Sequence, residues 1–366
     1  MSMIIDGTNG CTFPDTTVQT TTGKTGFVNR IINGAMVIDQ RNAGASVTPT
    51  NLQYTVDRWN TLLTQSGKFS VQQNSGSVTP PQGFSNYLGA VSLSAYSVTA
   101  GDRFVIQQSI EGYNISDLGW GTAGAKTITV SFWVRSSLTG TFGGAMIGGA
   151  GPASYPFSYT INSANTWEQK TIVVPGATSD TWGSTNTNGI SIRFSLGAAS
   201  NQSGTANAWA YSSNLSSATG AVSVVGTSGA TFYITGVQLE KGSTATSFDY
   251  RPYGTELALC QRYYYLGQSN SGYTIALGGM YSGSEMNAVL QHPVTMRTAP
   301  SFVATSGTNY YSFWANNTQN SFNTLNMIDA TASNARLYGT VTVTIGYSGF
   351  LKTNNASSSI AFNAEL

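Results

Sequence analysis

The sequence predicts an all-β protein: a jelly-roll β-sandwich, a smaller β-sandwich-like C-terminal domain after it, and a short N-terminal attachment segment before it. Short runs of β-branched and aromatic residues recur between Gly, Ser, Thr and Asn turns. Several runs alternate apolar and polar residues, as half-buried strands do, and in 128–134 one face takes Ile128, Val130, Phe132 and Val134. Between residues 28 and 250 no helical periodicity competes, apart from a turn expected at 110–118.

The first 28 residues form the predicted attachment segment. Turn dipeptides separate very short β-prone runs at Asp6-Gly7, Asn9-Gly10 and Pro14-Asp15. A segment of this kind cannot bury a core of its own. We therefore expect residues 1–28 to pair with other chains or to serve as an attachment tail.

Residues 29–252 form the predicted jelly roll. Many short strands at regular spacing, without intervening helices, indicate an antiparallel sandwich or barrel. The expected strands cover 35–41, 59–63, 69–73, 87–93, 103–110, 127–135, 154–161, 168–174, 190–196 and 231–239.

The second unit, 253–366, begins after a boundary at 250–255, where Pro252 and Gly254 punctuate the backbone. A short helical run at 256–261 opens it. Its expected strands cover 263–266, 273–277, 285–292, 301–305, 335–345 and 360–366.

The composition limits the classes of partner. The 366 residues carry a formal net charge of +1 and no basic run, which argues against DNA or RNA binding. Only 8% of residues are charged, against an ordinary share of about 25%, so the surface is polar but uncharged. No apolar stretch approaches the length of about 20 residues that spans a bilayer, so we expect no membrane insertion. Cys11 and Cys260 lie in different predicted units and are expected to be free thiols.

Five segments carry a resemblance to phage tail-fibre and related virion structural proteins: 13–21, 29–44, 54–59, 230–265 and 292–300. The resemblance implies a fibre or other external appendage of the virion, usually a homotrimer. It also implies synthesis in the host cytoplasm, which agrees with the lack of a signal-peptide pattern at the N-terminus. In this family context, residues 1–28 would hold other virion proteins, and the exposed part would bind host surface polysaccharide.

Within the first unit, the layout is similar to jelly-roll carbohydrate-binding modules at Asn33, Gly34, Trp59, 167–174 and 233–239. That family often carries a structural calcium ion, held partly by an acidic residue of the last strand. The corresponding residues 233–237 contain no carboxylate, and a hard cation prefers several oxygen ligands that include Asp or Glu. We therefore expect no cofactor and no metal residues, with a structural calcium ion as the remaining alternative.

Aromatic residues in polar loops are the candidate glycan contacts, because sugar rings stack on flat apolar side chains while amides bind their hydroxyls. These candidates are Tyr113, Trp120, Trp182, Asn186, Trp209 and Tyr211. Loop aromatics also plug sandwich ends or fill subunit contacts, and that alternative stays open. Tyr310, Tyr311 and Trp314 in the second unit carry the same two interpretations. The candidates for a trimer or interdomain contact are Tyr253, Arg262 and Tyr264.

No catalytic residue is expected. His292 is the single histidine and has no motif of a nucleophile or metal site around it. Glycoside hydrolysis generally uses two carboxyl groups, but the acidic residues are better explained as turn or strand-edge residues: Asp102, Glu111, Asp117, Glu168 and Asp180. The leading hypothesis is thus a non-enzymatic adhesin. The alternatives are a structural or decorating subunit of capsid, collar or baseplate, and a polysaccharide depolymerase.

Overall fold

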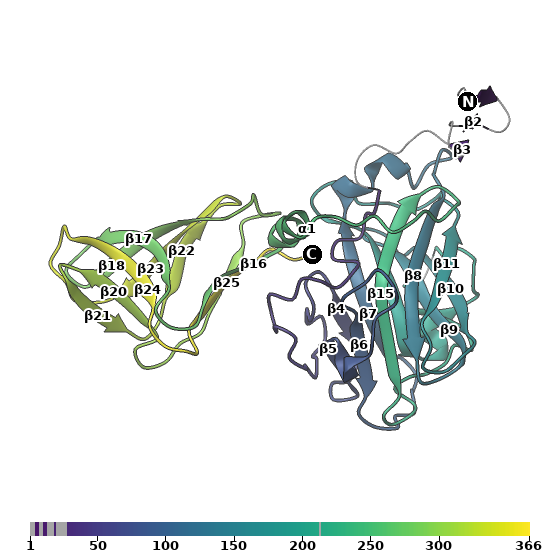
Figure 1. Ribbon diagram of the computed structural model, residues 1–366, viewed down its shortest axis with the longest axis horizontal. Coiled ribbons are helices and arrows are strands. Elements are labelled where there is room, and N and C mark those ends of the chain that lie inside the picture. The colour runs from purple at the N-terminus through teal and green to yellow at the C-terminus, as the bar shows by residue number, and fades with distance from the viewer. Residues whose placement is uncertain (1–3, 7–9, 13–17, 20–27, 212–213) are drawn as a thin grey trace.

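The computed structural model describes residues 4–6, 10–12, 18–19, 28–211 and 214–366. Two β lobes lie side by side along the long axis, and helix α1 (Tyr253–Gln261) lies between them (Figure 1). Three short antiparallel strands pair within the first segment: β1 (Ile4–Asp6), β2 (Gly10–Thr12) and β3 (Val18–Gln19). In the described part of the chain, no helix is both long and apolar enough to cross a membrane.

The larger lobe is a sandwich of two five-stranded antiparallel sheets. The first sheet has the order β10 (Ser154–Ile161), β9 (Gly140–Gly148), β12 (Asn188–Ala198), β7 (Arg103–Glu111) and β4 (Asn60–Leu63). The second has the order β11 (Glu168–Val174), β8 (Ile128–Ser136), β15 (Thr231–Lys241), β6 (Leu88–Ser92) and β5 (Phe69–Gln73). Neighbours along each sheet are mostly distant in sequence, so the fold is the predicted jelly-roll type of sandwich.

Short elements fill the loops of this lobe. The two-residue strands β13 (Ser203–Gly204) and β14 (Ser217–Ala218) pair in parallel. The 3-10 turns are η1 (Ser75–Ser77), η2 (Gly112–Asn114), η3 (Ser116–Leu118) and η4 (Ser200–Gln202). Two of them, η2 and η3, confirm the turn predicted at 110–118.

The core of the sandwich is built by the period-two alternation of its strands. The predicted inward face of β8 is completely buried, at Ile128, Val130, Phe132 and Val134. Phe132 meets Phe194 of the facing sheet with ring centroids 5.0 Å apart, in an edge-to-face arrangement. Truncating one such ring to alanine costs about 3–5 kcal/mol, so these contacts hold the two sheets together.

Strand β15 contains a bulge that sets which of its residues face the core. Its register with β8 shifts between Thr235 and Gln238, where one extra residue is inserted. Gly236 takes a positive φ of 60° there, and a Cβ on it would lie 2.6 Å from the Phe84 ring. The bulge brings Val237 to the core side although Ile234, three residues earlier, already faces the core.

One strand predicted for this lobe is absent from the described residues, and one strand present was not predicted. No strand covers 35–41, because Asn33 and Met36 both take a positive φ of 57°, which interrupts extended backbone. Strand β9 was missed because its glycines at 140, 143, 144 and 148 hide the alternation. Glycine is required at position 144, where a Cβ would lie 2.3 Å from the carbonyl oxygen of Arg193.

The smaller lobe is a second β structure with its own core. A three-stranded sheet has the order β16 (Tyr264–Ser269), β25 (Ser359–Asn363) and β19 (Ser301–Ala304). A seven-stranded sheet has the order β21 (Thr318–Phe322), β20 (Tyr311–Ala315), β24 (Ser348–Thr353), β17 (Thr274–Met280), β18 (Glu285–Gln291), β23 (Asn334–Thr340) and β22 (Asn326–Ala330). Of these, β20, β21, β22 and β24 were not predicted.

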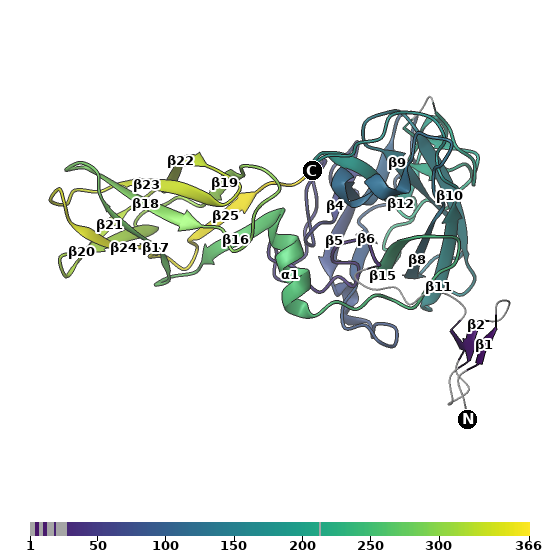
Figure 2. The ribbon, with the colours of Figure 1, turned by 90° about the horizontal axis from the view of Figure 1, so that it is seen from above.

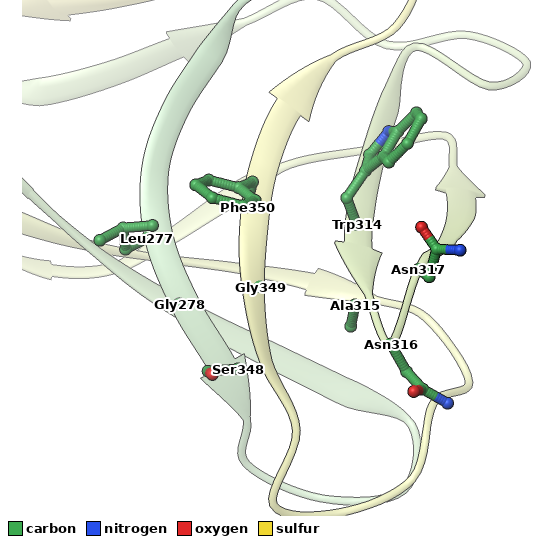
Figure 3. Close-up of a pocket in the computed structure, with 9 residues that line it drawn as sticks. All are labelled: Leu277, Gly278, Trp314, Ala315, Asn316, Asn317, Ser348, Gly349 and Phe350. Carbon is green, nitrogen blue, oxygen red and sulfur yellow. The ribbon is translucent and has the colours of Figure 1, made fainter.

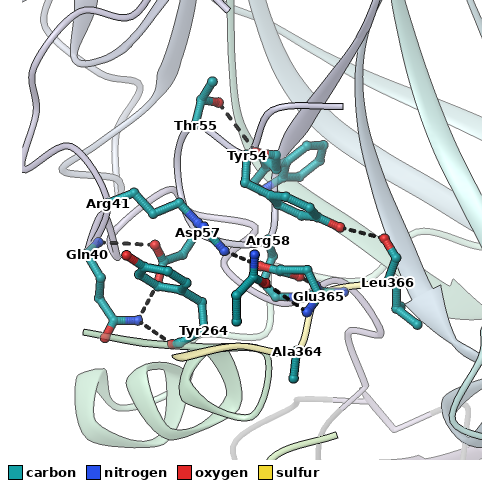
Figure 4. Close-up of polar contacts among 12 residues, drawn as sticks. Gln40, Arg41, Tyr54, Thr55, Asp57, Arg58, Tyr264, Ala364, Glu365 and Leu366 are labelled. Carbon is teal, nitrogen blue, oxygen red and sulfur yellow. Dashed lines mark hydrogen bonds and ion pairs between the residues drawn. The ribbon is translucent and has the colours of Figure 1, made fainter. Parts of the chain in front are cut away.

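The last residues of the sequence return to the junction of the two lobes, as both ribbon views show (Figures 1 and 2). Glu365 forms ion pairs with Arg58 and Arg41 of the sandwich, the latter at 3.0 Å (Figure 4). The backbone oxygen of Leu366 accepts a hydrogen bond of 3.0 Å from the Tyr54 hydroxyl. A small apolar cluster also joins Ile32 and Ile38 of the sandwich to Cys260 and Tyr263. Polar and apolar contacts thus fix one lobe against the other.

Candidate functional site

An apolar platform crosses the outer face of the seven-stranded sheet in the smaller lobe (Figure 3). It consists of Trp314, Phe350 and Leu277, on the neighbouring strands β20, β24 and β17. The register places Trp314 opposite Phe350, and Phe350 opposite Leu277. Their exposed fractions are 40%, 52% and 67%. Three large apolar side chains in one cross-strand row are therefore open to solvent. Single exposed apolar residues are common on protein surfaces, but a contiguous row of this kind is typical of a binding surface.

The strand pattern explains why these side chains point outward. Successive residues of a strand face opposite sides, so Trp314 faces away from Phe313, and Phe350 faces away from Leu351. Phe313 and Leu351 are completely buried in the core of the lobe. The outward-facing side chains of these strands thus form the platform, and their inward-facing side chains form the core of the lobe.

A two-residue turn of asparagines borders the platform. Asn316 and Asn317 join β20 to β21, and their positive φ values of 48° and 55° are those of a type I′ hairpin turn. Asparagine tolerates this conformation better than most residues, which accounts for the pair at this position. Both residues are exposed and line the same hollow; Figure 3 shows Asn317 next to Trp314 and Asn316 farther along, at the tip of the hairpin. An amide can donate to and accept from sugar hydroxyls.

The hollow above this row has a volume of about 470 Å³. Its floor includes Gly278 and Gly349, and its edge includes Ala315 and Ser348. A Cβ on Gly349 would lie 2.1 Å from the carbonyl oxygen of Trp314, so only glycine allows β24 to approach β20 this closely. None of the nine lining residues carries an ionisable side chain. The site therefore offers flat apolar rings, amides and a hydroxyl, which is the chemistry of a saccharide platform.

Three tryptophans predicted as glycan contacts, Trp120, Trp182 and Trp209, form one cluster with each other. Their ring centroids lie 4.8–5.7 Å apart, in edge-to-face arrangements. Each indole N–H donates to a backbone carbonyl oxygen, of Lys126, Ser179 and Pro175 respectively. Trp120 is buried and belongs to the sandwich core, so it presents no face to a ligand, and the other two are half-buried against that core.

The other predicted glycan contacts have different surroundings. Tyr211 is partly exposed and stacks on Trp209 at a centroid distance of 6.0 Å. Tyr113 is exposed at 59% beside a second hollow lined by Asn29, Arg30 and Arg251. Asn186 exchanges hydrogen bonds with Arg297 of the smaller lobe, so its amide contributes to the junction. Ring contacts therefore join four of the six candidates: Trp120, Trp182, Trp209 and Tyr211. The backbone N–H of Tyr113 donates to Thr185, the residue before Asn186.

Of the predicted trimer or interdomain residues, two contact the opposite lobe within the chain. Arg262 donates two hydrogen bonds to the buried carboxylate of Glu111, at 2.6 and 3.0 Å. Burial acts to raise the pKa of Glu111, but the bonds from Arg262 and Tyr263 outweigh it and lower that pKa. The guanidinium carbon of Arg41 lies over the Tyr264 ring, 3.6 Å from the ring centroid. Tyr253 is exposed, at the start of α1.

Of the remaining polar candidates, Asp102 is hydrogen-bonded within the protein and His292 packs against an aromatic ring. Asp102 accepts bonds from Thr64, Tyr96 and Thr99. His292 is buried against Phe362, with centroids 4.8 Å apart, and burial lowers its pKa. Among the described residues, no group of three His, Cys, Asp or Glu side chains could hold a metal ion. Calcium also binds backbone and amide oxygens, which that observation does not cover, so the calcium alternative stays a prediction. Cys260 is a buried free thiol, and the side chain of Cys11 lies outside the described residues.

The platform itself was only partly visible in the sequence. Trp314 was noted as a candidate, but Phe350, Leu277 and the asparagine turn were not. The available signal was the Asn-Asn pair after an aromatic run, which predicts a hairpin and hence a strand at 311–315. Strand β24, which supplies Phe350, carries no clean alternation, and its pairing with β20 spans the intervening hairpins.

The sequence matches no protein-family model, and no curated protein is significantly similar to it. Part of the chain is similar to the enzymatically active domain of tailspike protein 4 of bacteriophage CBA120, with 13% identity and a TM-score of 0.32, over 59% of this chain and 22% of that chain. A putative sugar binding protein from Bacteroides thetaiotaomicron gives 13% identity and a TM-score of 0.35, over 58% of this chain and all of that one.

A third similar structure is the family 11 carbohydrate-binding module of a cellulosomal cellulase of Clostridium thermocellum. Its identity is 14% and its TM-score 0.28, over 56% of this chain and 99% of that chain. At identities and TM-scores this low, the similarities carry no information about the ligands or activity of this chain.

Proposed function

We propose that this chain binds saccharide through the platform of Trp314, Phe350 and Leu277, and does so without cleaving it. The observation that carries the proposal is the exposed row of apolar side chains beside two exposed asparagine amides. Stacking on flat rings and hydrogen bonding to amides are the two contacts that a pyranose needs. The hollow of about 470 Å³ also falls within the size range of small-molecule sites.

The setting we propose for this binding is a phage virion, in a tail fibre or similar appendage that adheres to host surface polysaccharide. The resemblance of five sequence segments to such proteins supports it. In this setting the chain is a homotrimer made in the host cytoplasm, and residues 1–28 hold other virion proteins. The platform strands β17, β20 and β24 lie toward the end of the smaller lobe that points away from the sandwich, and an accessible position of this kind supports a role in adhesion (Figure 1).

Binding without cleavage is supported by the positions of the carboxylates. The lining of the platform contains none, and glycoside hydrolysis generally needs two at the scissile bond. The acidic residues considered earlier are engaged elsewhere: Glu111 with Arg262, Asp117 with Arg30 and Lys241, Glu168 with Lys170, Asp102 with Thr64, Tyr96 and Thr99, and Asp180 with the backbone N–H of Ala153. These carboxylates hold loops and lobes together.

The test is saccharide binding by the purified protein and its variants, measured by titration against envelope polysaccharide of a susceptible host. Trp314→Ala and Phe350→Ala are each expected to weaken binding about tenfold or more, because loss of a central aromatic anchor costs over about 1.4 kcal/mol. Val173→Ala, at an exposed position of β11 in the sandwich, is the matched control and should leave affinity unchanged.

Other outcomes separate the alternatives. If Tyr113→Ala and Tyr211→Ala abolish binding while Trp314→Ala does not, the saccharide site lies in the sandwich loops. If Trp314→Ala changes the oligomeric mass and the wild type binds no saccharide, the platform is a subunit contact, as a decorating protein would need. Release of reducing ends from the polysaccharide by the wild type would identify a depolymerase.

A further inference from the structure

Lys352 is a charged side chain next to the uncharged platform. It lies two residues after Phe350 in β24, so both side chains leave the same face of the sheet. Its Nζ lies 5.0 Å from the centroid of the Trp314 ring. The register sets Lys352 opposite Ser312 of β20 and Thr274 of β17, which are uncharged.

Within the described ranges, no carboxylate forms an ion pair with this ammonium group. Lys352 takes part in none of the ion pairs found in the described part of the chain. The ion pair of Arg336 and Asp329 lies in the same sheet, but on strands β23 and β22, which β17 and β18 separate from β24. In a chain with only 8% charged residues, an unpaired lysine beside an aromatic platform is a specific feature of this surface.

We infer that the platform selects anionic saccharides, whose acidic group pairs with Lys352 while the sugar ring stacks on Trp314 or Phe350. This inference rests on the saccharide binding proposed above and names its ligand class. An acidic sugar carries its negative charge within a few ångströms of its own ring, and Lys352 Nζ lies at a similar distance, 5.0 Å, from the centroid of the Trp314 ring. A cation over an aromatic face gains from a carboxylate or phosphate that approaches it, because a charge-assisted hydrogen bond is stronger than a neutral one.

The experiment compares acidic polysaccharides with chemically neutralised partners on the full chain. The probes are polygalacturonate, alginate and hyaluronan, each with its carboxyl-reduced counterpart, and phosphomannan with its dephosphorylated mannan. The wild type is expected to bind at least one acidic probe about 10- to 100-fold more tightly than its neutral partner. The carboxylate and phosphate arms show which anion is preferred. Because this comparison uses only the wild type, it does not depend on a variant that folds.

Lys352→Met then tests the residue. It should remove most of the preference for the acidic probe and leave the affinity for the neutral partner nearly unchanged, whereas Lys352→Arg should keep the preference. The matched control is Lys126→Met, at an exposed lysine of the sandwich, which should bind like the wild type.

Two results would overturn the inference, and they are distinguishable. Equal affinity of the wild type for acidic and neutral partners, with no effect of Lys352→Met, refutes the role of the lysine but leaves saccharide binding intact. Binding to no probe of either kind refutes the saccharide function and the inference together.

Discussion

Replacing Arg58 with methionine should destabilise the protein, because Arg58 is a buried charge that holds the two lobes together. Its side chain is 1% exposed and forms an ion pair with Glu365. It also donates a hydrogen bond of 2.6 Å to the backbone oxygen of Ser109, and its guanidinium lies 3.5 Å from the centroid of the Tyr263 ring. Methionine keeps much of the length of the side chain and removes the charge and the donors.

The magnitude follows from what is left behind. Removing one partner of a buried ion pair costs about 3–5 kcal/mol, since the other charge stays buried without compensation. Here Arg41 remains 3.0 Å from Glu365, so we expect a loss near the lower limit, about 3 kcal/mol. Urea denaturation followed by tryptophan fluorescence measures it, because Trp59 is buried directly beside Arg58.

The matched control is Arg336→Met. Its ion pair with Asp329 is also short, at 2.7 Å, but the two side chains are 42% and 62% exposed. Exposed pairs contribute only about 0.2–1 kcal/mol. A loss for Arg58→Met no larger than that for Arg336→Met would refute the view that burial makes the junction pair important. Adding Glu365→Gln to Arg58→Met should recover part of the loss, because it removes the stranded charge.

Two further predictions concern pH and glycine. Burial raises the pKa of Asp57 from 3.8 to about 7, so ionisation of that carboxyl penalises the folded state and stability should fall as pH rises from about 4 through 7. Asp57→Asn should reduce this dependence of stability on pH, measured by thermal melts at several pH values. An unchanged slope of stability against pH would contradict the assignment. Gly349→Ala should destabilise the smaller lobe by about 1–3 kcal/mol, because its Cβ would collide with the Trp314 carbonyl. Gly254→Ala, in helix α1 with nothing near its Cβ, should instead stabilise by up to about 1 kcal/mol, and equal effects in urea denaturation would count against both assignments.

Much of the sandwich could be predicted because alternation is local. Phe69–Gln73, Ser154–Ile161 and Glu168–Val174 were predicted with the bounds they have in the structure. Successive residues of a half-buried strand alternate between apolar and polar, so the strand can be predicted without knowing which strand it pairs with. Where glycine replaces the alternating side chains, as in β9, or where a bulge-like turn breaks the backbone at Asn33, that local signal is lost.

The sequence by itself determined the all-β class, most sandwich strands and the helix near 256–261, since each depends on residues close together in the chain. Only the tertiary structure decided which side chains meet. Arg58 and Glu365 lie 307 positions apart, and Trp314 joins Leu277 and Phe350 only because β24 pairs with both β20 and β17. It also decided which tryptophans are open: Trp120 is covered by its neighbours, while Trp314 faces solvent. Exposure depends on the packing of the whole fold, and residue type does not encode it.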